Sequence, residues 1–199
     1  MKILKNIIKL ILGDYSLYRI YLFDAKVENP GKNQTSVNLN SKLSEISDIS
    51  LLQASPYKEI AILESYGGDG AYGFGAWNNK GELVSACWFW DKVRYQSRNF
   101  WPLKEKEAKL VQINTSLAYQ GQGIARNLLL FATDKMTQKG FERIYARIWH
   151  SNTPSLKAFE KAGWKYVAFV IEIFPLGRKK PFRWRISKHA STFNSDNRV

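Results

Sequence analysis

Residues 120–126 have the composition of a backbone site for a bound phosphate. The segment reads Gln-Gly-Gln-Gly-Ile-Ala-Arg, and Gly121 and Gly123 let a ligand approach the main chain closely. Residues 110–117 before it suit a strand, and apolar residues recur at helical spacing over 124–139. The first N–H groups of such a helix lack partners, and the helix dipole favours an anion there by roughly 0.3–1 kcal/mol. The segment is therefore predicted to hold a pyrophosphate at the start of a helix.

Two sequence patterns occur together around this segment. Gln120, Gly123 and Ala125 fit the pattern Gln/Arg-x-x-Gly-x-Gly/Ala, and the segment matches neither a Walker loop nor a dinucleotide fingerprint. Residues 152–164 then begin with Asn152 and end with Glu-Lys-Ala-Gly-Trp. In order and separation the two patterns resemble the two signatures of the GNAT acetyltransferase superfamily, over roughly residues 107–173.

The resemblance implies acetyl-CoA, or another acyl-CoA, as the donor, with no metal. The strand around 113–117 would pair with the pantetheine amides, residues 120–126 would hold the pyrophosphate, and residues 152–159 would contact the pantetheine arm and its thiol end. The implied cofactor-binding residues are Ile113, Thr115, Leu117, Gln120, Gly121, Gln122, Gly123, Ile124, Ala125, Arg126, Asn152, Ser155 and Phe159. From the residues alone, Asn152 also suits a simple helix cap.

The resemblance leaves the proton transfers open. An acceptor amine attacks only when neutral, so a base or a water relay must take its proton. Glu107, at the start of the central strand, and His150, at the end of the neighbouring strand, are the candidate bases. Each could instead be an ordinary surface or strand-end residue. Many relatives have a Tyr where this chain has Phe159, so the usual general acid is missing from its usual place.

The order of elements predicts one α/β (α+β) domain over residues 15–189 with the GNAT fold. The resemblance implies a mixed central sheet of about six to seven strands, splayed at the acyl-CoA site, with helices on both faces. Expected strands are 15–23, 71–77, 82–90, 110–117, 143–149, 164–174 and 182–186. Expected helices are two short ones within 43–66, then 124–139 and one from residue 152, while 28–42 and 92–106 read as loops.

Both ends of the chain differ from this domain in composition. Residues 1–14 form an amphipathic basic segment that is too short and charged to span a bilayer and is a poor secretory signal. Residues 1–12 could lie on an anionic membrane, dock on the domain, or contact a second subunit in a homodimer. Residues 190–199 read as a disordered tail. The single Cys87 excludes a disulfide within the monomer and suits a cytoplasmic protein. If residues 1–12 lie on a membrane, the protein would be peripheral at its inner surface.

The formal net charge of +13 points to anionic partners beyond the donor. We therefore expect an N-acetyltransferase in which a primary amine attacks the thioester directly. The favoured acceptor is a small soluble amine, such as an amino sugar on an anionic nucleotide carrier. A non-catalytic acyl-CoA sensor stays open as an alternative. A nucleic-acid-binding module is less favoured, because the chain has no recognised nucleic-acid motif.

Overall fold

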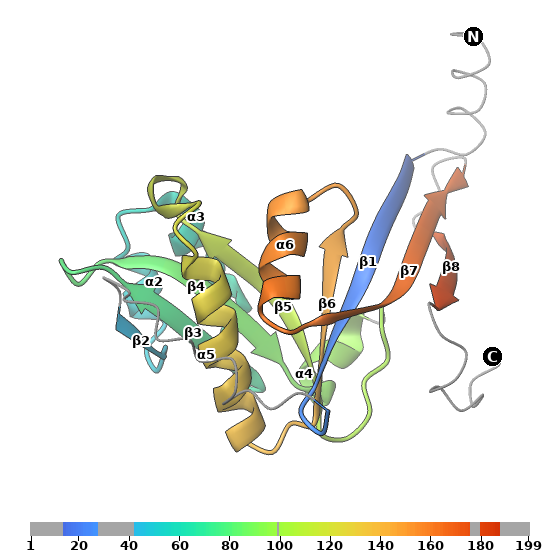
Figure 1. Cartoon of the computed structure of the whole chain (residues 1–199), viewed down its shortest axis with the longest axis horizontal. Coiled ribbons are helices and arrows are strands. Elements are labelled where there is room, and N and C mark those ends of the chain that lie inside the picture. The colour runs from blue at the N-terminus through green and yellow to red at the C-terminus, as the bar shows by residue number, and fades with distance from the viewer. Residues whose placement is uncertain (1–13, 28–41, 99, 176–179, 188–199) are drawn as a thin grey trace, which may run out of the picture.

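The computed structural model describes residues 14–27, 42–98, 100–175 and 180–187. The predicted basic segment before residue 14 and the predicted tail from 190 lie outside these ranges. In chain order the elements, with η for short 3-10 helices, are β1 (Asp14–Asp24), β2 (Lys42–Glu45), α2 (Ser50–Gln53), α3 (Lys58–Ala61), η2 (Ile62–Tyr66), β3 (Ala71–Trp77), β4 (Leu83–Trp90), α4 (Lys92–Tyr95), η3 (Gln96–Arg98), β5 (Glu107–Thr115), η4 (Leu117–Tyr119), α5 (Ile124–Gln138), β6 (Arg143–Trp149), α6 (Thr153–Lys161), β7 (Lys165–Phe174) and β8 (Phe182–Ser187) (Figure 1).

The described strands form one mixed sheet in the order β2-β3-β4-β5-β6-β1-β7-β8. This confirms the predicted fold class, with eight strands where about six to seven were expected. The strand that the sequence did not reveal is β2, which spans only four residues and is half-exposed. So short a run carries too little alternation of apolar and polar residues to be told from the neighbouring loop.

The N-terminal strand β1 has an internal place in the sheet. It pairs antiparallel with β6 on one side and with β7 on the other, so the first described strand lies among the last ones. Figure 1 shows β1, in blue, between β6 and β7. Ile20 and Tyr21 are fully buried there. The strand predicted at 15–23 is thus confirmed, but its neighbours could not be read from the sequence.

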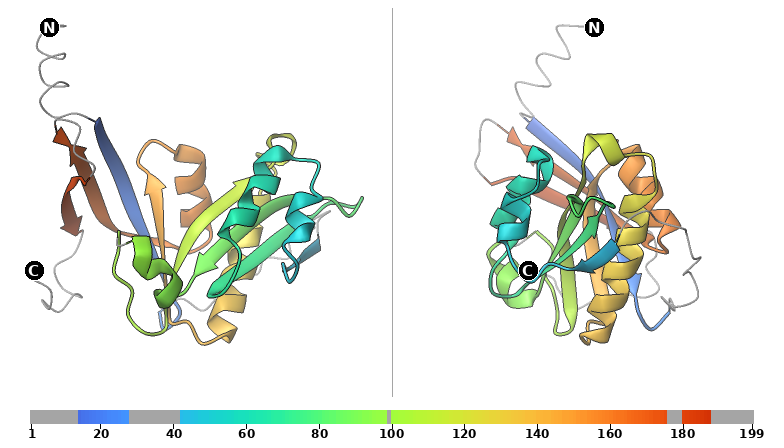
Figure 2. Two further views of the ribbon diagram at one scale, coloured as in Figure 1. Left: turned by 180° about the vertical axis from the view of Figure 1, so that it is seen from behind. Right: turned by 90° about the vertical axis from the view of Figure 1, so that its left-hand side faces the viewer.

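Helices cover both faces of the sheet, as predicted. Leu128 and Met136 of α5 pack in one core with Leu156 and Phe159 of α6. On the opposite face, α2, α3 and η2 pack over β4 (Figure 2). Helix α4 packs on the same face over β4 and β5. The segment predicted as a loop at 92–106 instead begins with two short helices, α4 and η3, which lie wholly within it. Both are single turns, too short for a periodic signal.

The sheet opens between β5 and β6. These parallel strands pair from Glu107↔Arg143 to Leu110↔Ala146, and no pairing is recorded between them beyond that point. Strand β5 continues to Thr115 with only β4 beside it, and Figure 1 shows the two arrows diverging. The strand was predicted to reach residue 117, but it ends at Thr115 and a 3-10 turn follows. The splayed sheet that the sequence predicted is therefore present.

Candidate functional site

The edge of β5 beyond Leu110 is where a ligand can pair with the main chain. Residues 111–115 are only half-buried, whereas 107–110 are buried. Ile113 packs against the core beneath α5, and the Thr115 hydroxyl lies 2.8 Å from that of Ser85. Leu117 does not belong to this edge, because it lies in η4 and its N–H donates to the Glu59 carboxylate at 2.9 Å.

The loop before α5 presents free backbone N–H groups at the mouth of this opening. Gly121 and Gly123 have φ of 77° and 79°, the left-handed conformation that glycine adopts without strain, and a Cβ at either would meet nothing within 4 Å. Gly123 is the N-cap of α5, no side chain caps the helix, and its first turn holds no acidic residue. Ile124, Ala125 and Arg126 therefore begin a helix that can bind an anion.

Two glutamine side chains hold the shape of this loop. The Gln120 amide donates to the Thr115 carbonyl at 3.1 Å, and the Gln122 amide donates to the Ala118 carbonyl at 3.3 Å. Both bonds return to the segment between β5 and α5. These two side chains are thus engaged within the loop, while the glycine main chain stays open.

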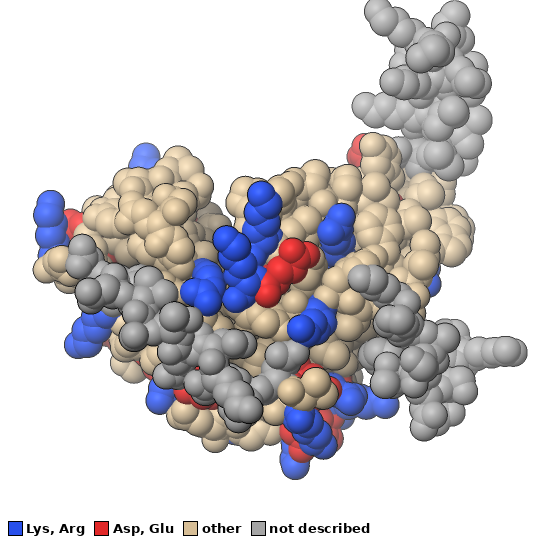
Figure 3. Space-filling model, in the orientation of Figure 1, with Lys and Arg blue, Asp and Glu red and all other residues tan. Residues whose placement is uncertain are grey.

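Arg126 links α5 to the end of α6. Its Nε donates to the Lys161 carbonyl at 3.2 Å. Figure 3 shows basic side chains gathered in the middle of the face that α5 and α6 cover. On α6, Lys157 and Lys161 are exposed. This face therefore carries positive charge beside the helix start.

Helix α6 begins as the sequence predicted. Asn152 is its N-cap, and its side-chain oxygen accepts a hydrogen bond from the Ser155 N–H at 3.2 Å. Pro154 lies in the first turn, where a missing N–H costs nothing. Asn152 is exposed and Ser155 is half-buried, so both remain accessible at the open end of β6.

Phe159 belongs to the core rather than to an open surface. It is 2% exposed and packs against Trp164 and Tyr21, with ring centroids 5.0 and 6.1 Å away. The phenol beside it, Tyr21, donates its hydroxyl to Glu160 at 2.7 Å. Burial, reinforced by this bond, raises the pKa of Tyr21 to about 12. A tyrosine therefore lies next to Phe159, but its proton is already engaged.

The structure separates the two predicted bases. Glu107 is buried at the closed end of the β5–β6 pair, where it accepts from the Lys104 N–H at 2.8 Å and lies 3.4 Å from the Tyr145 hydroxyl. His150 follows β6 at the open end, and its buried Nδ1 has no hydrogen-bond partner in the described part of the chain. His150 thus has a buried ring nitrogen without a hydrogen-bond partner among the described residues, and Glu107 is held within the sheet.

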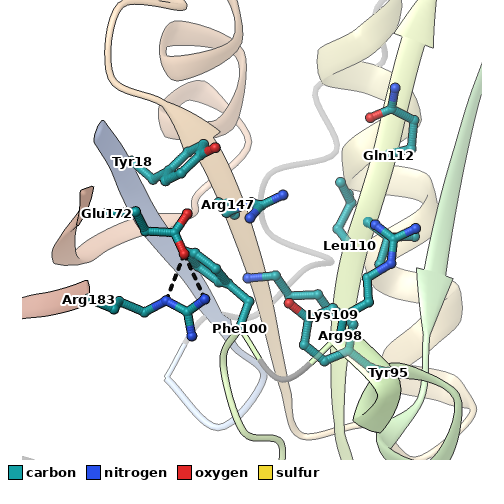
Figure 4. Close-up of a pocket in the computed structure, with 11 residues that line it drawn as sticks. Tyr18, Tyr95, Arg98, Phe100, Lys109, Leu110, Gln112, Arg147, Glu172 and Arg183 are labelled. Carbon is teal, nitrogen blue, oxygen red and sulfur yellow. Dashed lines mark hydrogen bonds and ion pairs between the residues drawn. The ribbon is translucent and has the colours of Figure 1, made fainter. Parts of the chain in front are cut away.

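A cavity of about 340 Å³ lies on the face opposite α5 and α6 (Figure 4). It borders the point where β5 and β6 part. The lining residues are Tyr18, Tyr95, Arg98, Phe100, Lys109, Leu110, Val111, Gln112, Arg147, Glu172 and Arg183. Of these, only Tyr95, Arg98 and Phe100 lie in the segment 92–106 that the sequence predicted as a loop, and the others come from strands distant in the chain.

Lys109 is the most unusual member of this lining. It is 2% exposed, and its Nζ has no hydrogen-bond partner among the described residues. The rings of Tyr95 and Phe100 lie 5.9 and 5.8 Å from that nitrogen. Burial holds the pKa of Lys109 well below its usual range, and the charges of Arg147 and Arg185 lower it further. A cluster of three or more metal-ligating side chains is not found in the described residues.

The chain belongs to the GNAT family of acetyltransferases. The model of this family, described as "Acetyltransferase (GNAT) family", matches residues 41–164. The match includes β5, the glycine loop, α5 and α6, which are the elements that surround the opening. Strand β1 lies outside the matched range, although it completes the sheet beside β6.

Solved structures share the fold at low identity. A tandem GNAT protein from the clavulanic acid biosynthesis pathway is 11% identical with a TM-score of 0.57, covering 94% of this chain and 57% of its own. A functionally unknown conserved protein from Staphylococcus epidermidis is 14% identical with a TM-score of 0.56, covering 87% and 66%. A GNAT-family acetyltransferase from Colwellia psychrerythraea is 18% identical with a TM-score of 0.53, covering 82% and 57%. No curated protein matches significantly.

The chain spans less than two thirds of the length of each of these three structures. At such identities the likeness concerns the fold. No described helix is long and apolar enough to cross a membrane.

Proposed function

We propose that the chain is an acetyl-CoA-dependent N-acetyltransferase that acts on the primary amine of a small soluble acceptor. One observation carries this proposal: the parallel strands β5 and β6 part after Leu110 and Ala146, beside the uncapped start of α5. A long, phosphate-bearing thioester can then pair with a free strand edge and place its pyrophosphate on a helix N-terminus. Family membership supports the same assignment.

The donor would occupy the face of the sheet that carries α5 and α6. Backbone N–H groups from Gly121 to Arg126 would bind the pyrophosphate, whereas the Gln120 N–H donates to the Leu117 carbonyl at 3.4 Å. The edge of β5 at 113–115 would pair with the pantetheine amides. Asn152 and Ser155, accessible at the start of α6, would contact the arm. Leu117 is not part of the strand edge proposed to pair with the pantetheine arm, because it lies in η4 and its N–H donates to Glu59.

The acceptor would enter from the opposite face through the 340 Å³ cavity, whose lining reaches Leu110 at the end of the β5–β6 pairing. Its neutral amine attacks the thioester carbonyl, the C–N bond forms, and the C–S bond breaks with release of the CoA thiolate. The thiol of CoA has a pKa of about 8.5, so its thiolate needs only modest help to leave. This suits a chain with Phe159 in the core and the Tyr21 proton engaged.

His150 and Glu107 remain the candidates for taking the proton of the amine. His150 is favoured by its position at the open end of β6 and by its unpartnered Nδ1. Glu107 is already occupied by the Lys104 N–H. In this proposal the base acts at the open end of the strands, directly or through water.

Donor binding is tested by isothermal titration with acetyl-CoA. Replacing Gly123 with Trp should abolish binding, because the indole would fill the approach to the free N–H groups and the φ of 79° disfavours any side chain. Gly81→Trp is the matched control: Gly81 has φ of 76° and equally open surroundings, but it lies in the β3–β4 turn. Unchanged binding by the Gly123 variant, or no binding by the native chain, would refute the assignment.

A non-catalytic acyl-CoA sensor is the second candidate. It is favoured because Phe159 has no hydroxyl and the hydroxyl of the neighbouring Tyr21 already donates to Glu160. Thiol release from acetyl-CoA in the presence of a panel of amines separates the two. An enzyme releases CoA in proportion to the amine supplied, whereas a sensor binds acetyl-CoA tightly and releases none.

A further inference from the structure

We propose that the acceptor carries an anionic group, a phosphate or a carboxylate, in addition to its amine, and that Lys109, Arg147 and Arg98 bind this group in the cavity. The inference rests on the proposed function and names the substrate class of the same site. Figure 4 shows these three side chains around the space between β5 and β6. They come from β5, β6 and η3.

The charges that line the cavity are unbalanced. Four basic residues face one acidic residue, Glu172. The Glu172 carboxylate is committed to Arg183, whose Nε and second guanidinium nitrogen donate to it at 2.8 and 2.6 Å. The charges of Arg98, Lys109 and Arg147 are therefore left without a balancing carboxylate in the lining.

Arg147 and Arg98 are oriented by aromatic rings. The Arg147 guanidinium lies 4.4 Å from the ring centroid of Phe100 and 4.6 Å from that of Tyr18. Arg98 lies 4.4 Å from the ring of Trp90. Stacking uses the flat faces of a guanidinium and leaves its in-plane N–H groups available for a bidentate phosphate or carboxylate. Both arginines are exposed enough for a ligand to reach them.

Lys109 supplies the second, independent indication of a ligand. A buried amine without a hydrogen-bond partner is costly, because its N–H groups have lost water and gained nothing. An anion in the cavity would give Lys109 its missing partner and stabilise its charged form. The charged and titratable groups that line the cavity with this lysine or act on its charge are Tyr18 from β1, Tyr95 from α4, Arg98 from η3, Arg147 from β6, Glu172 from β7, and Arg183 and Arg185 from β8.

The cation cluster also selects against a simple amine. An amine without an anionic group is protonated in water and would bring a further positive charge toward Arg98 and Arg147, which repel it. An acceptor that brings an anionic group offsets this repulsion. Its amine, held near the same cations, is then easier to deprotonate, since nearby positive charge disfavours the ammonium form.

The experiment measures binding of paired amines to the chain saturated with CoA, so that the helix start of α5 is already occupied. The pairs are ethanolamine and phosphoethanolamine, glucosamine and glucosamine 6-phosphate, and butylamine and 4-aminobutyrate. We expect the anionic member of at least one pair to bind about tenfold or more tightly than its partner. The phosphate and carboxylate pairs identify which anion the cavity prefers.

Variants connect this preference to the cavity. Arg147→Gln and Lys109→Met should each weaken binding of the anionic amine by about ten- to a hundredfold, and Arg147→Lys should retain part of it. Lys80→Met, an exposed lysine in the β3–β4 turn, removes the same charge elsewhere and should change nothing. Acetyl-CoA binding should be unaltered in all four variants.

Binding of the anion next to Lys109 should be coupled to the uptake of a proton. Binding of the anion should raise the pKa of the Lys109 amine, so complex formation takes up protons at pH values between the lowered pKa of the free chain and the higher pKa of the complex. Titrations in buffers of different ionisation enthalpy should reveal this uptake in the native chain and its loss in Lys109→Met. A purely structural lysine would not produce that difference.

Three results would overturn the inference: equal binding of both members of every pair, no binding of any anionic amine, or anionic binding that survives Arg147→Gln and Lys109→Met. Each can occur while acetyl-CoA still binds and thiol is still released, in which case the proposed function stands. Failure of the native chain to bind acetyl-CoA would instead refute the proposed function itself.

Discussion

The surroundings of Lys109 are unfavourable for a charged side chain. Its side chain is buried beside aromatic rings and arginines, and its Nζ has no hydrogen-bond partner in the part of the chain that the structure describes. Buried lysines without a partner are rare, because the charged form loses its hydration. A ligand that pairs with the amine would account for this arrangement. Without that ligand, the native chain should be less stable than a variant with an apolar side chain at this position.

Replacing Lys109 with Met should therefore raise the free energy of unfolding at pH 7, by about 1 kcal/mol or more. The folded-state pKa of Lys109 is lowered, so the unfolded state binds more protons and native stability rises with pH until about 10.4, the unfolded value. The advantage of the variant should shrink over that range. Urea denaturation at several pH values measures it.

Lys80→Met is the control for this stability effect, because Lys80 is exposed and its replacement should change stability little. A destabilised Lys109→Met variant, or an advantage that does not vary with pH, would contradict the account of a strained, desolvated amine.

At the scale of elements, β1 determines whether the second half of the sheet can form. It lies between β6 and β7, and Ile20 is paired with Arg147 on one side and Ala168 on the other. Without β1, both β6 and β7 would expose an unpaired edge next to the candidate site. Strand β8, by contrast, is an outer strand that pairs only with β7.

Proline substitutions distinguish these two positions. Ile20→Pro should prevent folding, because it removes a ladder hydrogen bond in an internal strand and a fully buried side chain, costing about 3 kcal/mol or more. Ile186→Pro in β8, where the isoleucine is 57% exposed, should leave a folded chain. Circular dichroism and thermal melting compare the two. Equal tolerance at both positions would argue against the internal place of β1.

Strand β8 nevertheless contributes to the cavity. The Arg185 guanidinium donates to the Phe100 carbonyl at 3.0 Å, and its carbon lies 5.0 Å from the Trp101 ring. The segment after η3 is thereby held against the sheet, with Phe100 between Arg147 and Arg183. An element at the edge of the sheet thus fixes an aromatic wall of the proposed acceptor site.

At the scale of the whole molecule, the opening between β5 and β6 is a weak line in an otherwise continuous sheet. Only four residue pairs join the two strands. One core bridges them, however, because Phe74 and Phe89 on one side share a hydrophobic cluster with Tyr21 and Trp164 on the other. The two halves should therefore fold together as one domain.

We expect unfolding in a single transition, with tryptophan fluorescence and far-UV circular dichroism coinciding. Acetyl-CoA at about 100 times its dissociation constant should stabilise the native chain by roughly 2.7 kcal/mol. Because the ligand would bind across the opening, it should shift both signals equally. Two separate transitions, or a shift in only one signal, would show that the halves are independent.

The local features of this chain were determined by the sequence itself. Glycines 121 and 123, the alternating strand at 143–149 and the Asn152 cap each depend on residues close together in the chain, so spacing alone predicted the loop, the strand and the helix start. Family membership followed from two such segments in the right order. The place of Phe159 in the core was less accessible, since a motif position does not reveal what surrounds a ring.

The tertiary structure alone decided the neighbours of β1 and the content of the cavity. The cavity lining comes from β1, α4, η3, β5, β6, β7 and β8, together with Phe100, and no short segment contains enough of it to form a pattern. Strand pairing over such separations depends on the packing of the whole sheet rather than on local propensity. For the same reason, the sequence predicted where the donor would bind and, from its net charge, an anionic partner, whereas the residues that would bind the anionic group became visible only once Lys109 and Arg147 were brought together.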